Sequence, residues 1–149
     1  METYVTLTPA MELAKSILLE ENATCAVLGK EEWYLSHERG VKPLLQWLDE
    51  GRSLHGCTAA DRVVGNGAAF LYVLLGVKEV YANVLSRDAL QTLQRFQIAV
   101  AYGQLAEWIQ NRAGDGRCPI EEAVSGETDP HAALIKIRNR LALLKGKGS

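Results

Sequence analysis

Residues 57–86, CTAADRVVGNGAAFLYVLLGVKEVYANVLS, predict a strand, a helix and a second strand in direct succession. The first strand, 57–64, ends in two valines, and a helix of small and apolar residues, 68–75, follows the turn Gly-Asn-Gly at 65–67. The segment 77–85 is rich in valine, as expected of a buried strand. Since a strand–helix–strand unit joins parallel neighbours, this stretch predicts an α/β fold.

The flanking segments complete the predicted order α-β-β-α-β-α-β-α-β, followed by further helices. Apolar periodicity and the placement of Pro, Gly and capping residues define each of them. They are a helix from Pro9 to Asn22, a hairpin of 23–29 and 32–35, a helix from Pro43 to Gly51, a helix over 89–96, a strand over 98–102, a helical turn over 105–109, and helices starting at Pro119 and Pro130.

Composition favours one compact domain outside membranes. The chain has 149 residues, 48% of them apolar, and a net charge of −2. The apolar run 67–77 is far shorter than the roughly 18 residues of a membrane span, and the N-terminus lacks the pattern of a secretory signal. We therefore expect a cytoplasmic protein with no membrane partner.

Charge is distributed unevenly along the chain. Residues 1–130 hold 11 basic and 18 acidic side chains, a net −7, whereas residues 131–149 hold 5 basic and no acidic ones. We divide the chain into a domain over 1–127 and an amphipathic helix with a basic tail over 128–149. Five cations on one helix are few for nucleic-acid binding, so a solvated or subunit-contacting helix, and with it a homodimer, is the expectation.

Several short motifs together resemble a known family. They are Gly40–Leu45, Ala60–Gly65, Val80–Ser86, Asn111-Arg112 and Cys118–Glu121. Their spacing is similar to that of a small, uncharacterised prokaryotic family with a cytidine-deaminase-like fold that lacks the zinc-binding motifs. The resemblance implies a three-layer α/β/α mixed sheet with an extra C-terminal helix, and it implies no assigned activity.

The zinc motifs of deaminases are missing from the corresponding positions. Zinc deaminases carry His/Cys-x-Glu at one helix start and Pro-Cys-x-x-Cys at the next. Here His37 and Glu38 are adjacent, and the turn 64–67 has no thiol. Three other potential ligands would have to meet from a loop and two element ends: His55, Cys57 and Cys118. We expect no metal site, no cofactor and no zinc-dependent deamination.

The junction between the strand 57–64 and the next helix is the strongest candidate site. Ligands of parallel sheets lie at the carboxyl ends of strands, where the N–H groups of a helix N-terminus attract anions. Gly65 and Gly67 permit close approach of a phosphate, the Asn66 amide can donate, Asp61 can accept from a ribose hydroxyl, and Arg62 can pair with a phosphate. The predicted partner is a small anionic, nucleotide-like ligand. Alternatively, the glycines serve a tight turn and close packing, and Asp61 caps the helix.

A second group of polar residues is expected to line the same pocket. Ser36 and Lys42 precede the second helix, and Ser86 follows the strand 77–85. Each of them also has a structural interpretation, with Ser86 as the N-cap of its helix and Lys42 as a solvated cation.

Two further hypotheses remain open. Cys118 precedes a helix start at Pro119, where the helix dipole lowers a thiol pKa and Arg112 or Arg117 can assist, so a cysteine-dependent enzyme is one of them. A buried, inert Cys118 is the alternative, with Glu121 completing a capping box. The other hypothesis is an oligomeric interaction subunit that uses the helix after Pro130.

Overall fold

The computed structural model describes residues 6–111 and 113–147 and contains a five-stranded mixed sheet with six helices. The elements are α1 (Pro9–Glu20), β1 (Cys25–Leu28), β2 (Trp33–Ser36), α2 (Lys42–Asp49), β3 (Thr58–Val64), α3 (Asn66–Leu75), β4 (Glu79–Ser86), α4 (Arg87–Arg95), β5 (Ala99–Ala106), α5 (Pro119–Ala123) and α6 (Pro130–Lys147). The predicted α/β class is confirmed.

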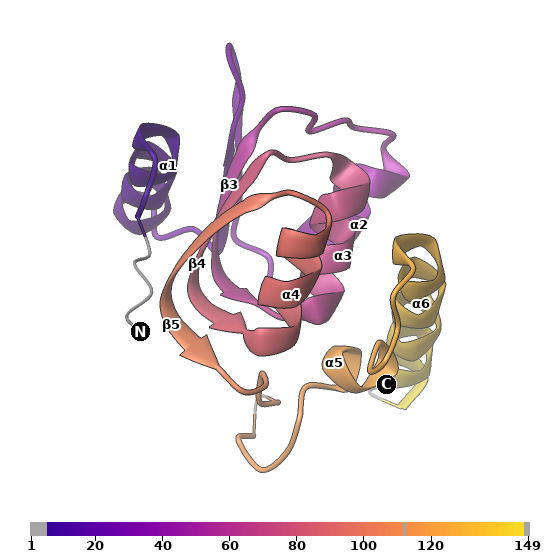
Figure 1. The fold of residues 1–149 in the computed structure, drawn as a ribbon. Helices are drawn as coiled ribbons and strands as arrows, with labels where there is room; N and C mark the ends of the chain where they lie inside the picture. Colours follow the sequence, from indigo (N-terminus) through magenta and orange to yellow (C-terminus); the bar gives the residue numbers. More distant parts are fainter. Residues whose placement is uncertain (1–5, 112, 148–149) are drawn as a thin grey trace.

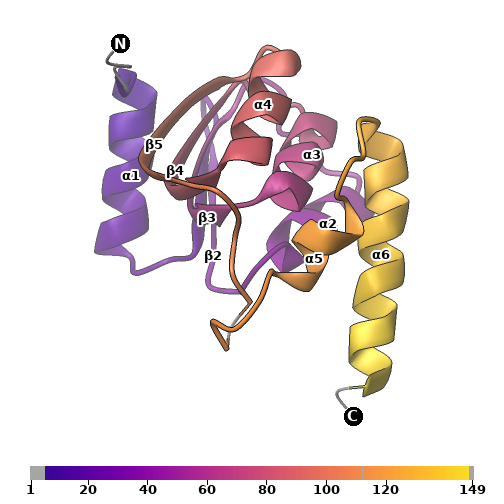
Figure 2. The ribbon, with the colours of Figure 1, turned by 60° about the horizontal axis from the view of Figure 1, so that its bottom comes forward.

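The sheet has the strand order β2-β1-β3-β4-β5. β1 is antiparallel to both β2 and β3, whereas β3, β4 and β5 are parallel and linked through α3 and α4. Figures 1 and 2 show α1 on one face of the sheet, α2, α3 and α4 on the other, and α5 and α6 stacked outside α3. The carboxyl ends of β3, β4 and β5 therefore meet at one edge, which we call the carboxyl edge.

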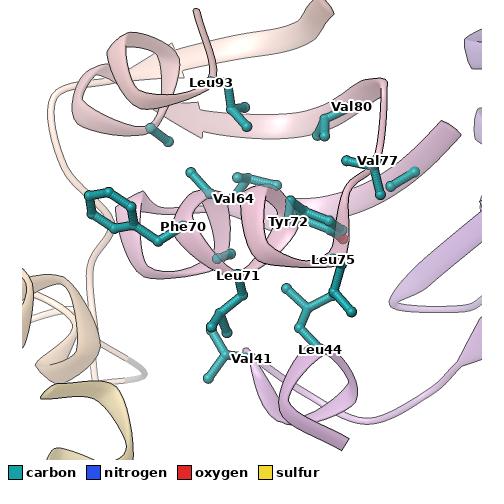
Figure 3. Packing of buried hydrophobic residues seen from close by; sticks show 14 of the residues in the cluster. Val41, Leu44, Val64, Phe70, Leu71, Tyr72, Leu75, Val77, Val80 and Leu93 are labelled. Carbon is teal, nitrogen blue, oxygen red and sulfur yellow. The ribbon is translucent and has the colours of Figure 1, made fainter. Parts of the chain in front are cut away.

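Helix α3 is the centre of the main hydrophobic core. Phe70, Leu71 and Tyr72 are fully buried on different sides of the helix (Figure 3). A helix that is apolar all round must be covered all round, and the sheet, α2, α4 and α6 supply that cover.

Local signals located several helix starts correctly. The Thr8 side chain accepts from the backbone N–H of Met11 at 3.1 Å, ahead of Pro9, and Ser86 caps α4 by accepting from Ala89 at 3.1 Å. The helical turn expected over 105–109 is wrong, because β5 continues to Ala106. Pairing with β4 along the whole of β5 overrides the local helical pattern there.

Helix α6 packs against α3 and shares its core. Ala133 and Ile137 are fully buried members of the main cluster, and Asp129 caps the helix by accepting from the Ala132 N–H at 3.2 Å. None of the helices in the described ranges, α6 included, is long and apolar enough to cross a membrane.

Candidate functional site

Four of the predicted ligand-binding residues surround the carboxylate of Glu121 at the carboxyl edge. The backbone N–H of Asn66, at the start of α3, donates to Glu121 Oε2 at 2.6 Å. The backbone N–H of Gly67 and the Ser86 hydroxyl, which precedes α4, lie near this carboxylate and lower its pKa. Glu121 is only 5% exposed. The N-terminus of α3 thus binds an anionic group, and that group belongs to the chain itself.

The surroundings of Glu121 act on its charge in opposite directions. Burial is the largest influence and raises the pKa of Glu121, since removal from water disfavours the carboxylate, and Asp88 adds repulsion. The N–H and hydroxyl donors of Asn66, Ser86 and Gly67 oppose this shift. The site therefore has the donors for an anion but holds its present one at a desolvation cost.

Both glycines of the turn permit close approach of α5. A Cβ at Gly65 would lie 2.7 Å from Glu121 Cδ, and one at Gly67 would lie 2.6 Å from Ile120 Cγ2. The capping box expected at Cys118–Glu121 is wrong: Cys118 makes no side-chain cap to α5, and Glu121 instead caps α3.

We call Glu121, Asn66, Gly67 and Ser86 the Glu121 cluster. Asp61 is not part of it and lies in the core. Its Oδ2 accepts from the Tyr72 hydroxyl at 2.7 Å, and that hydroxyl lies 3.1 Å from Cys25 Sγ. All three side chains are buried. Burial raises the pKa of Asp61 to about 7, against the opposing effect of the Tyr72 hydrogen bond and two backbone N–H groups. The Asp61 carboxyl thus does not cap α3. It binds the hydroxyl of Tyr72, a residue in the later part of that helix.

The remaining predicted residues make separate local contacts. Arg62 Nε donates to the Ala23 carbonyl at 2.9 Å, which ties β3 to the segment after α1. Ser36 Oγ accepts from the backbone N–H of Glu38 at 3.1 Å. The exposed Lys42 ammonium lies 3.6 Å from the Glu38 carboxylate.

Asn66 also borders a small polar hollow next to the Glu121 cluster. The hollow measures about 260 Å³ and lies between α4 and residues 126–128. Arg95 and Thr92 line it, and the Thr92 hydroxyl donates to Asn66 Oδ1 at 2.5 Å. The carboxylates of Asp88 and Glu127 line the hollow as well, so one cation, two carboxylates and solvent access lie beside the start of α3.

A larger open groove runs along the carboxyl edge. It measures about 520 Å³ and is lined by Val63, Val84, Gln104 and residues 106–110. Val63, Val84 and Gln104 are neighbours in the strand register. The next residues along the same strands, 64, 85 and 105, pack into the main core. Since successive residues of a strand point to opposite faces, the side chains of Val63, Val84 and Gln104 point to the other face of the sheet. No local sequence pattern indicates this groove, because most of its lining comes from the end of β5 and the connection after it.

Cys118 is half-buried at the start of α5, and its backbone N–H donates to the Ile109 carbonyl at 2.8 Å. Arg112 lies outside the described residues. Within residues 6–111 and 113–147, no group of three or more His, Cys, Asp or Glu side chains is arranged to hold a metal ion.

Alkylation at neutral pH tests the cysteine hypothesis. We expect Cys118 to react before Cys25 and Cys57, because burial protects both of these and raises their thiol pKa values. Peptide mapping after iodoacetamide treatment gives the three rates. An activated nucleophile requires more: Cys118 must react faster in the native protein than in urea. A slower native rate would eliminate the cysteine-dependent alternative.

Together the fold and the carboxyl edge define an α/β domain whose central helix accepts a carboxylate at its N-terminus. A family model described as TM1506, a domain of unknown function (DUF1893), matches residues 13–141. The chain belongs to this family, which confirms the expectation of an uncharacterised family.

A solved relative has the same fold. The crystal structure of a DUF1893 family protein (TM1506) from Thermotoga maritima is similar with a TM-score of 0.80 and 20% sequence identity, over 95% of this chain and 96% of that chain. The comparison with curated proteins finds no match. The likeness establishes the shared fold alone.

Proposed function

We propose that this protein binds a small anionic, nucleotide-like ligand at the carboxyl edge, and that the anionic group of the ligand replaces the carboxylate of Glu121. The observation that carries the proposal is the 2.6 Å hydrogen bond from the Asn66 N–H to a buried carboxylate. Donors of this kind at a helix N-terminus serve a phosphate as well as a carboxylate. A phosphate offers more acceptor oxygens and more charge for the same donors.

The exchange requires a shift of α5, which packs against α3 and α6. Glu121 lies on a helix of five residues that follows the connection 107–118. A shift of α5 withdraws Glu121 while the backbone donors of α3 stay fixed by the core. Arg95, across the adjacent hollow, supplies a cation for the incoming group; of the two carboxylates beside it, Asp88 and Glu127, the second forms an ion pair with Lys136. Gly65, Asn66, Gly67 and Ser86 are thus the predicted residues on which this proposal rests.

We also propose that the fold is cytidine-deaminase-like. The support is the antiparallel hairpin β1–β2 followed by the parallel, helix-linked strands β3, β4 and β5, with helices on both faces of the sheet. In this proposal the edge that carries the metal in zinc deaminases binds an anion through helix N-termini.

Removal of the internal carboxylate should expose the anion site. We expect Glu121→Ala to bind inorganic phosphate and adenosine 5′-monophosphate at least roughly tenfold more tightly than the wild type, because an internal competitor lowers the fraction of open sites. Isothermal titration calorimetry gives the affinities. The same variant should lose about 1–3 kcal/mol of stability, because the Asn66 N–H loses its buried acceptor, and phosphate should restore part of it.

Glu122→Ala is the matched control. Glu122 is the next residue of α5, but its side chain is 55% exposed. It should leave both affinities at the wild-type value. Equal phosphate affinity in the wild type and Glu121→Ala, or no binding by either, would mean that Glu121 is a permanent cap and that the proposed function is wrong.

A further inference from the structure

The groove at the carboxyl edge has the chemistry of a site for a flat, uncharged ring. Trp108 is 52% exposed and Val63 is 45% exposed, so the groove presents apolar surface to solvent. Small-ligand sites combine an apolar lining with a few polar groups that fix the orientation of the ligand. Here the rim is formed by Gln104 and Gln110, and a primary amide both donates and accepts hydrogen bonds.

The charge at the groove disfavours an anionic group in its interior. Among the described residues, its lining holds one charged side chain, the Glu107 carboxylate, which forms an ion pair with Arg87 at the start of α4. A phosphate in the groove would meet this carboxylate. A neutral heterocycle would meet the Trp108 ring and the two amides instead. The volume of the groove, about 520 Å³, lies within the usual range of small-ligand sites.

The groove and the Glu121 cluster are close neighbours along two strands. Val63 precedes Gly65 by two residues, and Val84 precedes Ser86 by two residues. Two strand residues span roughly 7 Å along the chain. The groove and Glu121 lie on opposite faces of the sheet, so a nucleotide-sized molecule reaches both by passing around the carboxyl edge. The connection 107–118 begins beside the groove with Trp108 and leads directly to α5 and Glu121.

We infer that the groove binds the heteroaromatic ring of the ligand, a nucleobase, by stacking on Trp108 and hydrogen bonding to Gln104 and Gln110. This inference rests on the proposed function, since it assigns the uncharged half of the same ligand. Aromatic side chains accept any base by stacking, and the two amides then select among bases through the edge of the ring.

Nucleosides test the groove, which we call the ring site, because they carry the heteroaromatic ring without a phosphate. Adenosine, guanosine, cytidine and uridine are titrated separately into the full chain by calorimetry. At least one should bind the wild type, and Trp108→Ala should weaken that binding at least roughly tenfold, in line with the stacking contribution of an aromatic side chain. Trp33→Ala is the matched control, because Trp33 is 53% exposed but lies on β2. It should leave the affinity unchanged.

The possible results separate the two proposals. Phosphate binding that responds to Glu121→Ala, combined with no nucleoside binding, would overturn the ring site and leave the anion site intact. Nucleoside binding that depends on Trp108, with no added affinity from a 5′-phosphate, would support the ring site and overturn the anion site. Nucleoside binding that is equal in the wild type and Trp108→Ala would also overturn the inference. Both exposed tryptophans can be replaced without opening the core, and circular dichroism confirms the fold of each variant.

Discussion

The free energy of unfolding should fall by roughly 3 kcal/mol between pH 4 and pH 7 through Asp61 alone. Burial raises the pKa of this carboxyl from 3.8 to about 7 in the folded protein. Between these two values the native state keeps a proton that the unfolded state has lost. The stabilisation is therefore fully present below the unfolded pKa and disappears as pH rises through the folded one.

Urea unfolding at a series of pH values measures this effect. Asp61→Asn keeps an acceptor for the Tyr72 hydroxyl but removes the titration, so its stability should depend much less on pH. The raised pKa of Glu121 acts in the same direction, and the difference between the wild type and Asp61→Asn isolates Asp61. Parallel pH profiles of the two proteins would show that the Asp61 carboxyl titrates normally.

Gly67→Ala should lower the free energy of unfolding by about 2–3 kcal/mol, a typical cost of overpacking a tight core. The new methyl group would lie 2.6 Å from Ile120 Cγ2 and 3.5 Å from Ile137 Cδ1, so α5 has to move away from α3. Alanine has the higher helix propensity, by about 1 kcal/mol at an interior helix position, and this gain is smaller than the packing cost.

Gly116→Ala is the control for this substitution. Gly116 is exposed, and the nearest atom to its added Cβ is Asn111 Nδ2 at 3.5 Å, an ordinary contact. Its stability should stay within about 0.5 kcal/mol of the wild type, as is usual for surface changes. Similar urea midpoints for Gly67→Ala and Gly116→Ala would contradict the close packing of α5 on α3.

Sequence reasoning succeeded where the signal is local. The hydroxyl caps at Thr8 and Ser86, and the valine-rich run of β4, determine these elements through neighbouring residues, so the order of helices and strands could be predicted. The glycines at 65 and 67 indicated that something approaches the start of α3 closely, and the structure confirms that close approach.

The long-range contacts could not be predicted. Glu121 and Asn66 are 55 positions apart, and the local pattern around Glu121 favoured a cap on its own helix. Asp61 and Tyr72 face each other because a strand packs on the following helix, which pairs their side chains in the core. Only the packing of α5 on α3 decides that the predicted anion site contains a carboxylate of the chain itself.

A crystal structure of the wild-type protein grown with adenosine 5′-monophosphate is the decisive test of whether a ligand phosphate replaces the Glu121 carboxylate at the start of α3. We expect a phosphate oxygen within hydrogen-bond distance of the Asn66 N–H, Glu121 withdrawn from α3, and the adenine ring against Trp108. Glu121 Oε2 still 2.6 Å from the Asn66 N–H, with no nucleotide at the carboxyl edge, would contradict it.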